Sequence, residues 1–215
     1  MAIRKVGDCR ILGPLGKGGM ALVYRGVHEL LQREVAIKEL SPDSAKDPEK
    51  MSRFKREAMA LAGFHHQHIV TLYDLIEKND GWYMVMELVD GPTLSELIKE
   101  APLPPQVVSV VGLQLAHALE HAHFQRVVHR DLKPGNIMLT RSGAKLMDFG
   151  LARAVVPGAA PGDLTSAMTM SRSLTAQGVL VGTFLYMSPE QLEGKEADAR
   201  SDLWALGCVM YEMAT

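Results

Sequence analysis

The spacing of apolar residues changes near Gly91, and this change constrains the fold more than any other feature of the chain. From Cys9 to Leu40, short apolar runs are separated by glycines, which predicts three strands of an antiparallel sheet. After Gly91, apolar residues at helical spacing predict a long helix over 106–124. We therefore expect an α+β fold, in which a small sheet is followed by a mainly helical region.

Local signals add a helix and a hairpin to the first part. Asp47-Pro48 is typical of a helix start, and the apolar period after it predicts one main helix over about 48–62. Asn79-Asp80-Gly81 is a strong hairpin turn signal between two predicted strands, 69–73 and 82–87. The predicted sheet therefore gains two strands.

In the second part, Thr93 and Glu96 have the spacing of a capping box at the start of a further helix. The segment 154–178 is rich in serine and threonine and lacks periodicity, which predicts a mobile loop. Three histidines near the end of the long helix are interpreted as solvated or packing residues, because no cysteine or carboxylate completes a metal site: His117, His121 and His123.

Composition excludes several classes of protein. A net charge of −2 gives no electrostatic reason to expect a nucleic-acid partner. Cys9 and Cys208 are the only cysteines, so we expect free thiols in a reducing, intracellular compartment. The chain has neither the apolar stretch of a signal peptide nor an apolar run of about 18 residues, which predicts no membrane span within it.

The block His129–Asn136 concentrates polar groups in one short loop. Asp131, Lys133 and Asn136 supply a carboxylate, an ammonium and a carboxamide. Such groups can accept a hydroxyl proton, neutralise phosphate oxygens and hold a divalent metal ion. Another metal-capable carboxylate follows a short predicted strand, in Asp148-Phe149-Gly150. By itself this tripeptide is an ordinary turn signal, whereas the loop carries groups that suit phosphoryl transfer.

Three features of the first part are ambiguous when taken alone. The glycines of Gly16-Lys17-Gly18 allow backbone amides to approach a phosphate, but short glycine clusters also occur in ordinary turns. Lys38, at the end of a predicted strand, and Glu57, on a predicted helix, would each be solvated side chains by default.

The order of these motifs resembles that of the eukaryotic-type (Hanks-type) serine/threonine protein kinase catalytic domains. The amino-acid sequences of the motifs are similar to those of the bacterial branch. The resemblance covers about residues 9–215 and implies a two-lobed fold, with an N-lobe over about 9–87, a hinge over about 87–91 and a partial C-lobe from about 92. The matching motifs occur in the family's order: the glycine loop, Val35-Ala36-Ile37-Lys38, Glu57, His129–Asn136, Asp148-Phe149-Gly150 and Ser188-Pro189-Glu190.

The resemblance also implies catalytic roles. Asp131 matches the catalytic base, Lys133 the lysine near the γ-phosphate, and Thr183 belongs to the same catalytic set. Lys38 matches the lysine that binds the α- and β-phosphates, and Glu57 matches its ion-pair partner. Two further residues match the ligands of two Mg²⁺ ions, with Mn²⁺ as an alternative: Asn136 and Asp148.

The remaining matches are to nucleotide-binding residues. The loop that covers ATP, the walls around the adenine, the gatekeeper and the hinge are matched by Leu15, Gly16, Lys17, Gly18, Gly19, Val23, Ala36, Lys38, Met86, Glu87, Val89 and Met138.

By this resemblance the chain is a non-specific serine/threonine protein kinase that transfers the γ-phosphate of ATP to protein substrates. In the family, the arginine at the position of Arg130 commonly pairs with a phosphate on the activation loop, so activation by autophosphorylation is expected. A dimer could carry out this step in trans. The expected acceptors are Thr165, Ser166, Thr169, Ser171, Ser173 and Thr175. A cytoplasmic location is implied, either alone or as part of a longer membrane-anchored chain.

Some features depart from the family pattern. Ala21 replaces the third glycine of the loop, which we expect to tune the loop without preventing ATP binding. The apolar period of the last helix reaches Thr215 without a stop signal, so the C-lobe is expected to be incomplete. Glu190 would then lack the arginine that it pairs with in the family and would be an unpaired buried carboxylate. Two alternatives stay open: a catalytically silent, pseudokinase-like nucleotide-binding module or inactive fragment, and a small-molecule phosphotransferase.

Overall fold

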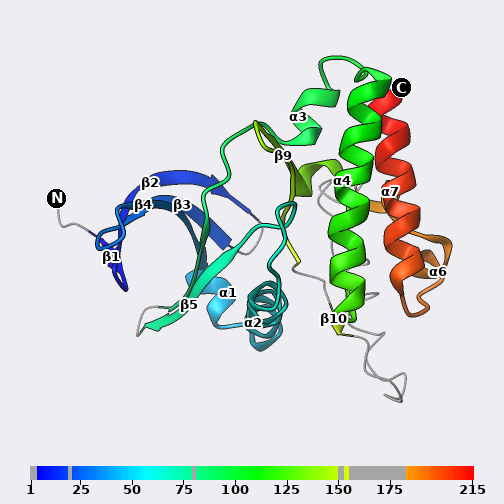
Figure 1. Ribbon diagram of the computed structural model, residues 1–215. Coiled ribbons are helices and arrows are strands. Elements are labelled where there is room, and N and C mark those ends of the chain that lie inside the picture. The colour runs from blue at the N-terminus through cyan, green and yellow to red at the C-terminus, as the bar shows by residue number, and fades with distance from the viewer. Residues whose placement is uncertain (1–3, 19–20, 79–80, 150–152, 155–182) are drawn as a thin grey trace. The chain divides into compact units, whose positions relative to one another are not determined.

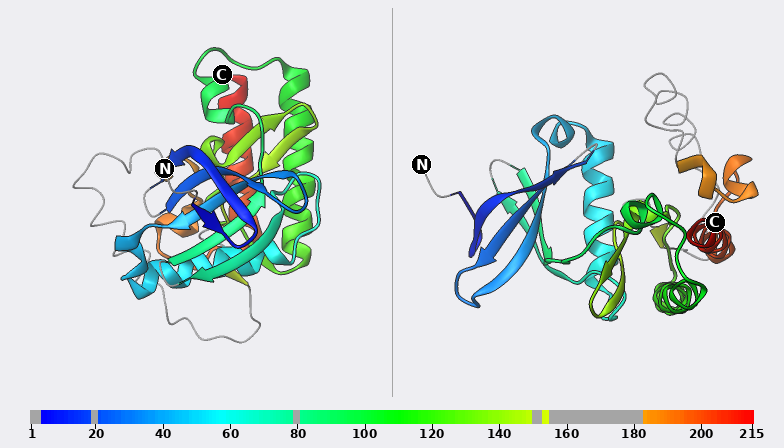
Figure 2. Two further views of the ribbon diagram at one scale, coloured as in Figure 1. Left: turned by 90° about the vertical axis from the view of Figure 1, so that its left-hand side faces the viewer. Right: turned by 90° about the horizontal axis from the view of Figure 1, so that it is seen from above.

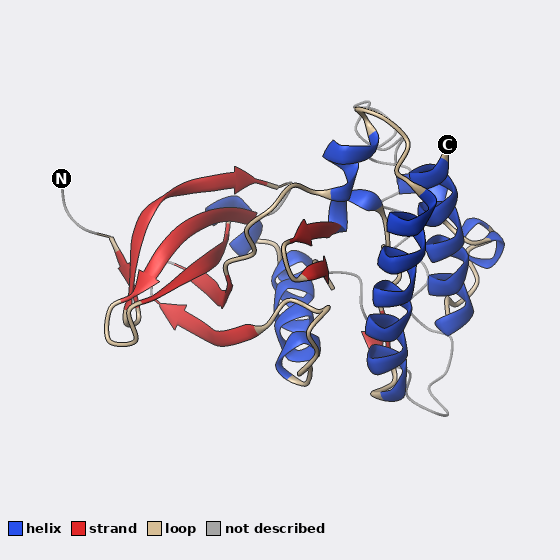
Figure 3. Ribbon diagram, turned by 45° about the horizontal axis from the view of Figure 1, so that its top comes forward, coloured by secondary structure: helices blue, strands red, loops and turns tan. Residues whose placement is uncertain are grey.

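The computed structural model describes residues 4–18, 21–78, 81–149, 153–154 and 183–215 (Figure 1). The chain divides into two compact units, Met1–Asp90 and Gly91–Thr215. Strands dominate the first unit and helices the second (Figure 3). The α+β class with an antiparallel sheet and a helical region is therefore confirmed.

The first unit is built on a six-stranded antiparallel sheet in the order β1-β2-β3-β4-β6-β5. Its strands are β1 (Lys5–Val6), β2 (Cys9–Lys17), β3 (Ala21–His28), β4 (Arg33–Leu40), β5 (Leu72–Lys78) and β6 (Gly81–Glu87). Strand β1 was not predicted from the sequence. Strand β5 begins at Leu72 rather than Ile69, because its pairing with β6 starts at Leu72. Ile69 and Val70 precede the strand as buried core residues. Residues 79 and 80 of the predicted turn lie outside the described part of the chain.

Helix α2 (Pro48–Ala62) has the bounds that the sequence predicts. The Asp47 side chain accepts hydrogen bonds from the backbone N–H groups of Glu49 and Lys50, at 3.0 and 3.3 Å. These bonds satisfy two of the donors that every helix start leaves free. A short helix, α1 (Pro42–Ala45), precedes it and was not predicted, because four residues are too few to show a period.

The second unit consists of helices with small pieces of sheet. Its helices are α3 (Leu94–Ile98), α4 (Pro105–Phe124), η1 (Pro134–Asn136), η3 (Thr183–Tyr186), α6 (Pro189–Leu192) and α7 (Ala199–Ala214). Its strands form the antiparallel pairs β7 (Val127–Val128) with β10 (Arg153–Ala154) and β8 (Ile137–Thr140) with β9 (Gly143–Leu146). The predicted capping box is present, since Thr93 Oγ1 accepts from Glu96 N–H at 3.2 Å and Thr93 N–H donates to Glu96 at 2.7 Å.

Helices α4 and α7 lie side by side, as Figure 2 shows most clearly in its right-hand view. Gly112 permits their close approach, because a Cβ added there would lie 2.8 Å from Met210 Cε. Val209 is fully buried in α7, whereas Leu203 in the same helix is 55% exposed. No helix in the described part of the chain has both the length and the hydropathy that a membrane crossing requires.

Candidate active site

In the first unit, Lys38 and Glu57 form a buried ion pair. Lys38 comes from β4 and Glu57 from α2, and Lys38 Nζ lies 2.7 Å from Glu57 Oε1. The residues are 9% and 1% exposed, so the reading of each as a solvated side chain is wrong. Burying either charge without the other would cost several kcal/mol, so the pair holds β4 and α2 in a fixed relation.

The strand register brings the expected nucleotide residues of this unit onto one face of the sheet. Val23 lies opposite Lys38, and Ala36 lies opposite Met86, while Ala36 and Lys38 are two positions apart on β4. Residues at this spacing point to the same side of a sheet, and so do directly opposed partners. Val23, Ala36, Lys38 and Met86 therefore share the face that carries the ion pair with α2.

The expected glycine loop is partly strand. Gly16 and Lys17 belong to β2 and pair with Val23 and Leu22 of β3. A Cβ added at Gly16 would meet nothing within 4 Å, so no packing contact explains this glycine. Gly18 N–H donates to Ala21 O at 2.8 Å, which closes the bend between the strands. Gly19 lies outside the described residues.

The other expected nucleotide residues of the first unit differ in exposure. Leu15 is 51% exposed on β2, and Ala21, the departure from the family pattern, is buried at 4%. Glu87 and Val89 are half-buried at and beyond the end of β6. The backbone N–H of Glu87 already donates to Thr71 O at 2.9 Å.

In the second unit, the His129–Asn136 block brings its polar side chains together. Lys133 Nζ lies 2.7 Å from Asp131 Oδ2, and Asn136 Nδ2 donates to Asp131 O at 2.8 Å and to Asp131 Oδ2 at 3.2 Å. Asn136 uses its nitrogen in these contacts, so its side-chain oxygen is the atom suited to a hard cation. The Asp131 side chain remains 18% exposed.

Asp202, at the start of α7, holds this block in place. Its Oδ2 accepts from His129 N–H and its Oδ1 from Arg130 N–H, each at 2.8 Å. His123 Nε2 lies 2.7 Å from the same Oδ2, so this histidine has a carboxylate partner that the sequence did not reveal. Arg130 has φ of 68°, a strained value that these bonds help to maintain.

His129 connects the block to the strand that precedes Asp148. Its Nδ1 accepts from Asp131 N–H at 3.2 Å, its Nε2 lies 3.0 Å from Met147 O, and its ring packs edge-on against Phe149. Met147 N–H donates to Asn136 O at 2.8 Å, so one expected metal ligand, Asn136, is hydrogen-bonded to the residue that precedes the other, Asp148. Asp148 itself is exposed and has φ of 55°.

The remaining predicted residues contribute less to the arrangement around Asp131. Met138, on β8, forms a bridge with Thr93. Thr183 opens η3, and its side chain is not described. The six expected phosphate acceptors of the 154–178 segment also lie outside the described residues.

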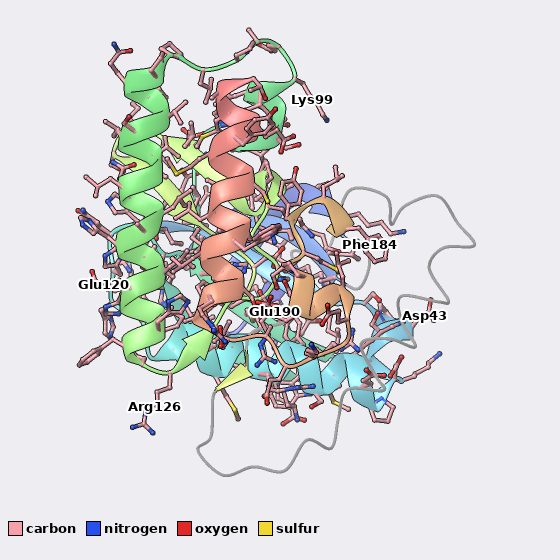
Figure 4. The ribbon with its side chains drawn as sticks, turned by 90° about the vertical axis from the view of Figure 1, so that its right-hand side faces the viewer. Asp43, Lys99, Glu120, Arg126, Phe184 and Glu190 are labelled. Carbon is pink, nitrogen blue, oxygen red and sulfur yellow. The ribbon has the colours of Figure 1, made fainter. Side chains whose placement is uncertain are left out.

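Glu190 was expected to be an unpaired, buried carboxylate, and this is wrong. It is half-buried beside the first turn of α7, and Ser201 Oγ donates to it at 2.5 Å (Figure 4). That hydrogen bond lowers the pKa of Glu190 below its usual range.

The sequence analysis did not identify the role of Asp202. Its partners lie 72 and 73 positions away along the chain, so no local pattern reports the contact. Among the described residues, no group of three histidine, cysteine or acidic side chains could hold a metal ion. The oxygen atoms suited to a cation are those of Asn136 and Asp148.

Comparison with known proteins assigns the class. The family model described as "Protein kinase domain" matches residues 9–215, and the chain therefore belongs to the protein kinase domain family. Within it, the chain is similar to bacterial serine/threonine-protein kinases. It is 44% identical to a probable one from Streptomyces coelicolor over 99% of this chain and 31% of the relative. It is 41% identical to PrkC of Bacillus subtilis over 97% of this chain and 30% of the relative, and 40% identical to PknB of Mycobacterium tuberculosis over 94% and 31%. The chain thus spans less than a third of the length of these relatives.

Proposed function

We propose that the chain transfers the γ-phosphate of ATP to serine and threonine hydroxyls of proteins. The observation that carries the proposal is the Asp131 carboxylate, which is held beside Lys133 and Asn136 and remains partly exposed. The names of the relatives support the acceptor class. That the whole protein acts on protein substrates is likewise part of this proposal.

Asp131 acts as the base. The acceptor oxygen forms a bond to the γ-phosphorus, the bond from that phosphorus to the β-γ bridging oxygen breaks to release ADP, and the hydroxyl proton passes to the Asp131 carboxylate. Lys133 neutralises phosphate charge and is anchored through its ion pair with Asp131. Asp202 keeps both groups aligned by fixing the backbone at His129 and Arg130.

Nucleotide binding rests on the first unit. Lys38 binds the α- and β-phosphates and is oriented by Glu57, while Val23, Ala36 and Met86 provide an apolar surface on the same face of the sheet. The open space at Gly16 allows a phosphate to approach the backbone. Asn136 and Asp148 hold divalent metal, with Mg²⁺ preferred, and the metal supplies charge neutralisation of the phosphates when bound.

We further propose that the chain phosphorylates itself within 154–178, and that a second copy acts in trans. Arg130 Nη2 donates to Ala197 O at 3.1 Å and lies 3.8 Å from a carboxylate oxygen of Glu196. A phosphate carries more charge than this exposed carboxylate and is a stronger partner for the guanidinium.

The test is phosphate incorporation from ATP and Mg²⁺ into a generic protein substrate, followed by phosphoamino-acid analysis and intact mass of the chain itself. Phosphoserine and phosphothreonine on the substrate, with added phosphate on the chain, are the expected results. Transfer to small hydroxyl compounds alone would identify a small-molecule phosphotransferase. Nucleotide binding with no transfer at all would identify a silent binding module.

A further inference from the structure

Glu39 is a buried carboxylate directly next to Lys38. Adjacent residues on a strand point to opposite faces, so Glu39 lies on the other side of β4 from the ion pair with Glu57. On that side Val35, Ile37, Tyr83 and Val85 form the core of the sheet. Glu39 is only 5% exposed at the end of this core.

The partners of Glu39 come from a neighbouring strand and from the start of the chain. Tyr83, directly opposite on β6, donates its hydroxyl to Glu39 Oε1 at 3.1 Å. The Arg4 guanidinium forms an ion pair with the same oxygen. Glu39 Oε2 is buried and has no hydrogen-bond partner among the described residues. Arg4 is therefore the only cation paired with this carboxylate in the described part of the chain.

Arg4 is fixed in place by more than one contact. Its guanidinium lies over the rings of Tyr24 and Tyr83, at 5.4 and 5.9 Å from their centroids, and donates to the Tyr83 hydroxyl at 3.1 Å. The hydrogen bond to Glu39 raises the pKa of Arg4 further above its usual range. Arg4 thus ties the segment before β1 to β3, β4 and β6 at one point.

That point lies one residue from the proposed phosphate-binding lysine. In the register, Leu22, Glu39 and Tyr83 form one row across the three strands, and Val23, Lys38 and Met84 form the next. Loss of Arg4 would leave the Glu39 charge buried without a cation, which is costly, and the Glu39 side chain would then turn toward water. Because Glu39 and Lys38 are bonded neighbours on β4, a shift of the backbone at Glu39 would also move Lys38.

We propose that Arg4 is a positioning residue for Lys38, acting through Glu39 on the opposite face of β4. The inference rests on the proposed function, because it assigns the segment before β1 a part in holding the nucleotide lysine. Lys5, the next residue, offers a matched control. Its ammonium lies 2.5 Å from Glu29 Oε2 in an exposed pair that does not touch β4.

The experiment measures the Kd for ATP of the 215-residue chain and of its variants by equilibrium titration. Arg4→Ala is expected to raise the Kd by about 5- to 50-fold, the range of coupling between residues in one ion-pair network, and Lys5→Ala is expected to leave it unchanged. In a Lys38→Ala chain, Arg4→Ala is expected to have no further effect. A purely structural role would instead weaken binding by the same factor in both backgrounds.

Glu39→Gln provides a second arm if Arg4→Ala does not fold. It removes the carboxylate charge, weakens the link to Arg4 and leaves no buried ion, so we expect a folded chain with a Kd raised by roughly 3- to 10-fold. An unchanged Kd in folded Arg4→Ala or Glu39→Gln would overturn the inference alone. Absence of ATP binding by the wild-type chain would contradict the proposed function and the inference with it.

Discussion

At the scale of single residues, Asp202 determines whether the His129–Asn136 block keeps its shape. Its side chain is 1% exposed, and its two oxygens accept the backbone N–H groups of His129 and Arg130. We expect Asp202→Ala to lower the free energy of unfolding by about 2–4 kcal/mol, because one buried and one part-buried backbone donor lose their carboxylate acceptor. Phosphate transfer should fall as well, since Asp131 follows directly.

Urea denaturation followed by circular dichroism measures this loss. Glu193→Ala is the control, because the Glu193 side chain forms an exposed ion pair with Lys195, and its loss should change stability by less than about 0.5 kcal/mol. Equal stability of Asp202→Ala and Glu193→Ala would show that the block does not depend on Asp202.

The single residues also show what sequence reasoning can reach. Asp131, Lys133 and Asn136 lie within six positions of one another, and their contacts with each other follow from that closeness. The pairing of Lys38 with Glu57 spans 19 positions and could be expected only from resemblance to a family. The contacts of Arg4 with Glu39 and of Asp202 with His129 join residues that are far apart in the sequence. They form only when the sheet and the helices are folded, so no local sequence pattern predicts them.

At the scale of elements, the start of α7 carries a charge whose effect depends on pH. Asp198 is its N-cap, and hydrogen bonds from Arg200, including one from its backbone N–H at 2.8 Å, lower the pKa of Asp198. A carboxyl with a depressed folded pKa contributes stability above its unfolded pKa of about 3.9 and loses it as pH falls through the folded pKa.

Asp198→Asn keeps a capping oxygen but removes this charge. We expect the variant to be less stable than wild type at pH 7, and the difference to shrink as pH falls from the unfolded pKa of Asp198 through its lower folded pKa, below which Asp198 is protonated in both states. Thermal unfolding at several pH values measures the difference. A gap between the two chains that stays constant from pH 7 to pH 3 would contradict the assignment.

The junction between strands and helices depends on Gly91. This residue has φ of 154°, and a Cβ there would lie 2.0 Å from Leu139 O, so the β8 backbone would have to move. We expect Gly91→Ala to cost at least about 1–3 kcal/mol, the usual cost of a strained backbone position. Gly207→Ala is the contrasting control, because a Cβ there meets nothing within 4 Å and helical alanine is favoured by up to about 1 kcal/mol.

Differential scanning calorimetry on both variants separates these effects, with Gly91→Ala lowering the Tm and Gly207→Ala raising it. A wild-type Tm for Gly91→Ala would mean that the junction does not require glycine. The elements themselves were predicted where periodicity is long, as in α2 and α4. They were missed where the element is only two or four residues long, as in β1 and α1.

At the scale of the whole molecule, the change of pattern at Gly91 coincides with the division into the two compact units. Each unit holds a separate part of the proposed chemistry. The first contains the Lys38–Glu57 pair and the glycines of β2, and the second contains Asp131, Lys133 and Asn136. Nucleotide binding and phosphate transfer should therefore respond differently to variants in the two units.

The most direct test compares ATP binding and phosphate transfer in wild type and Asp131→Asn. The account predicts that the variant binds ATP with a Kd within about twofold of wild type, because the base is not needed for binding. Phosphate incorporation into protein should fall by about 10²- to 10⁴-fold, the usual contribution of a positioned base. Undiminished incorporation by Asp131→Asn would contradict the account, since another group would then accept the hydroxyl proton.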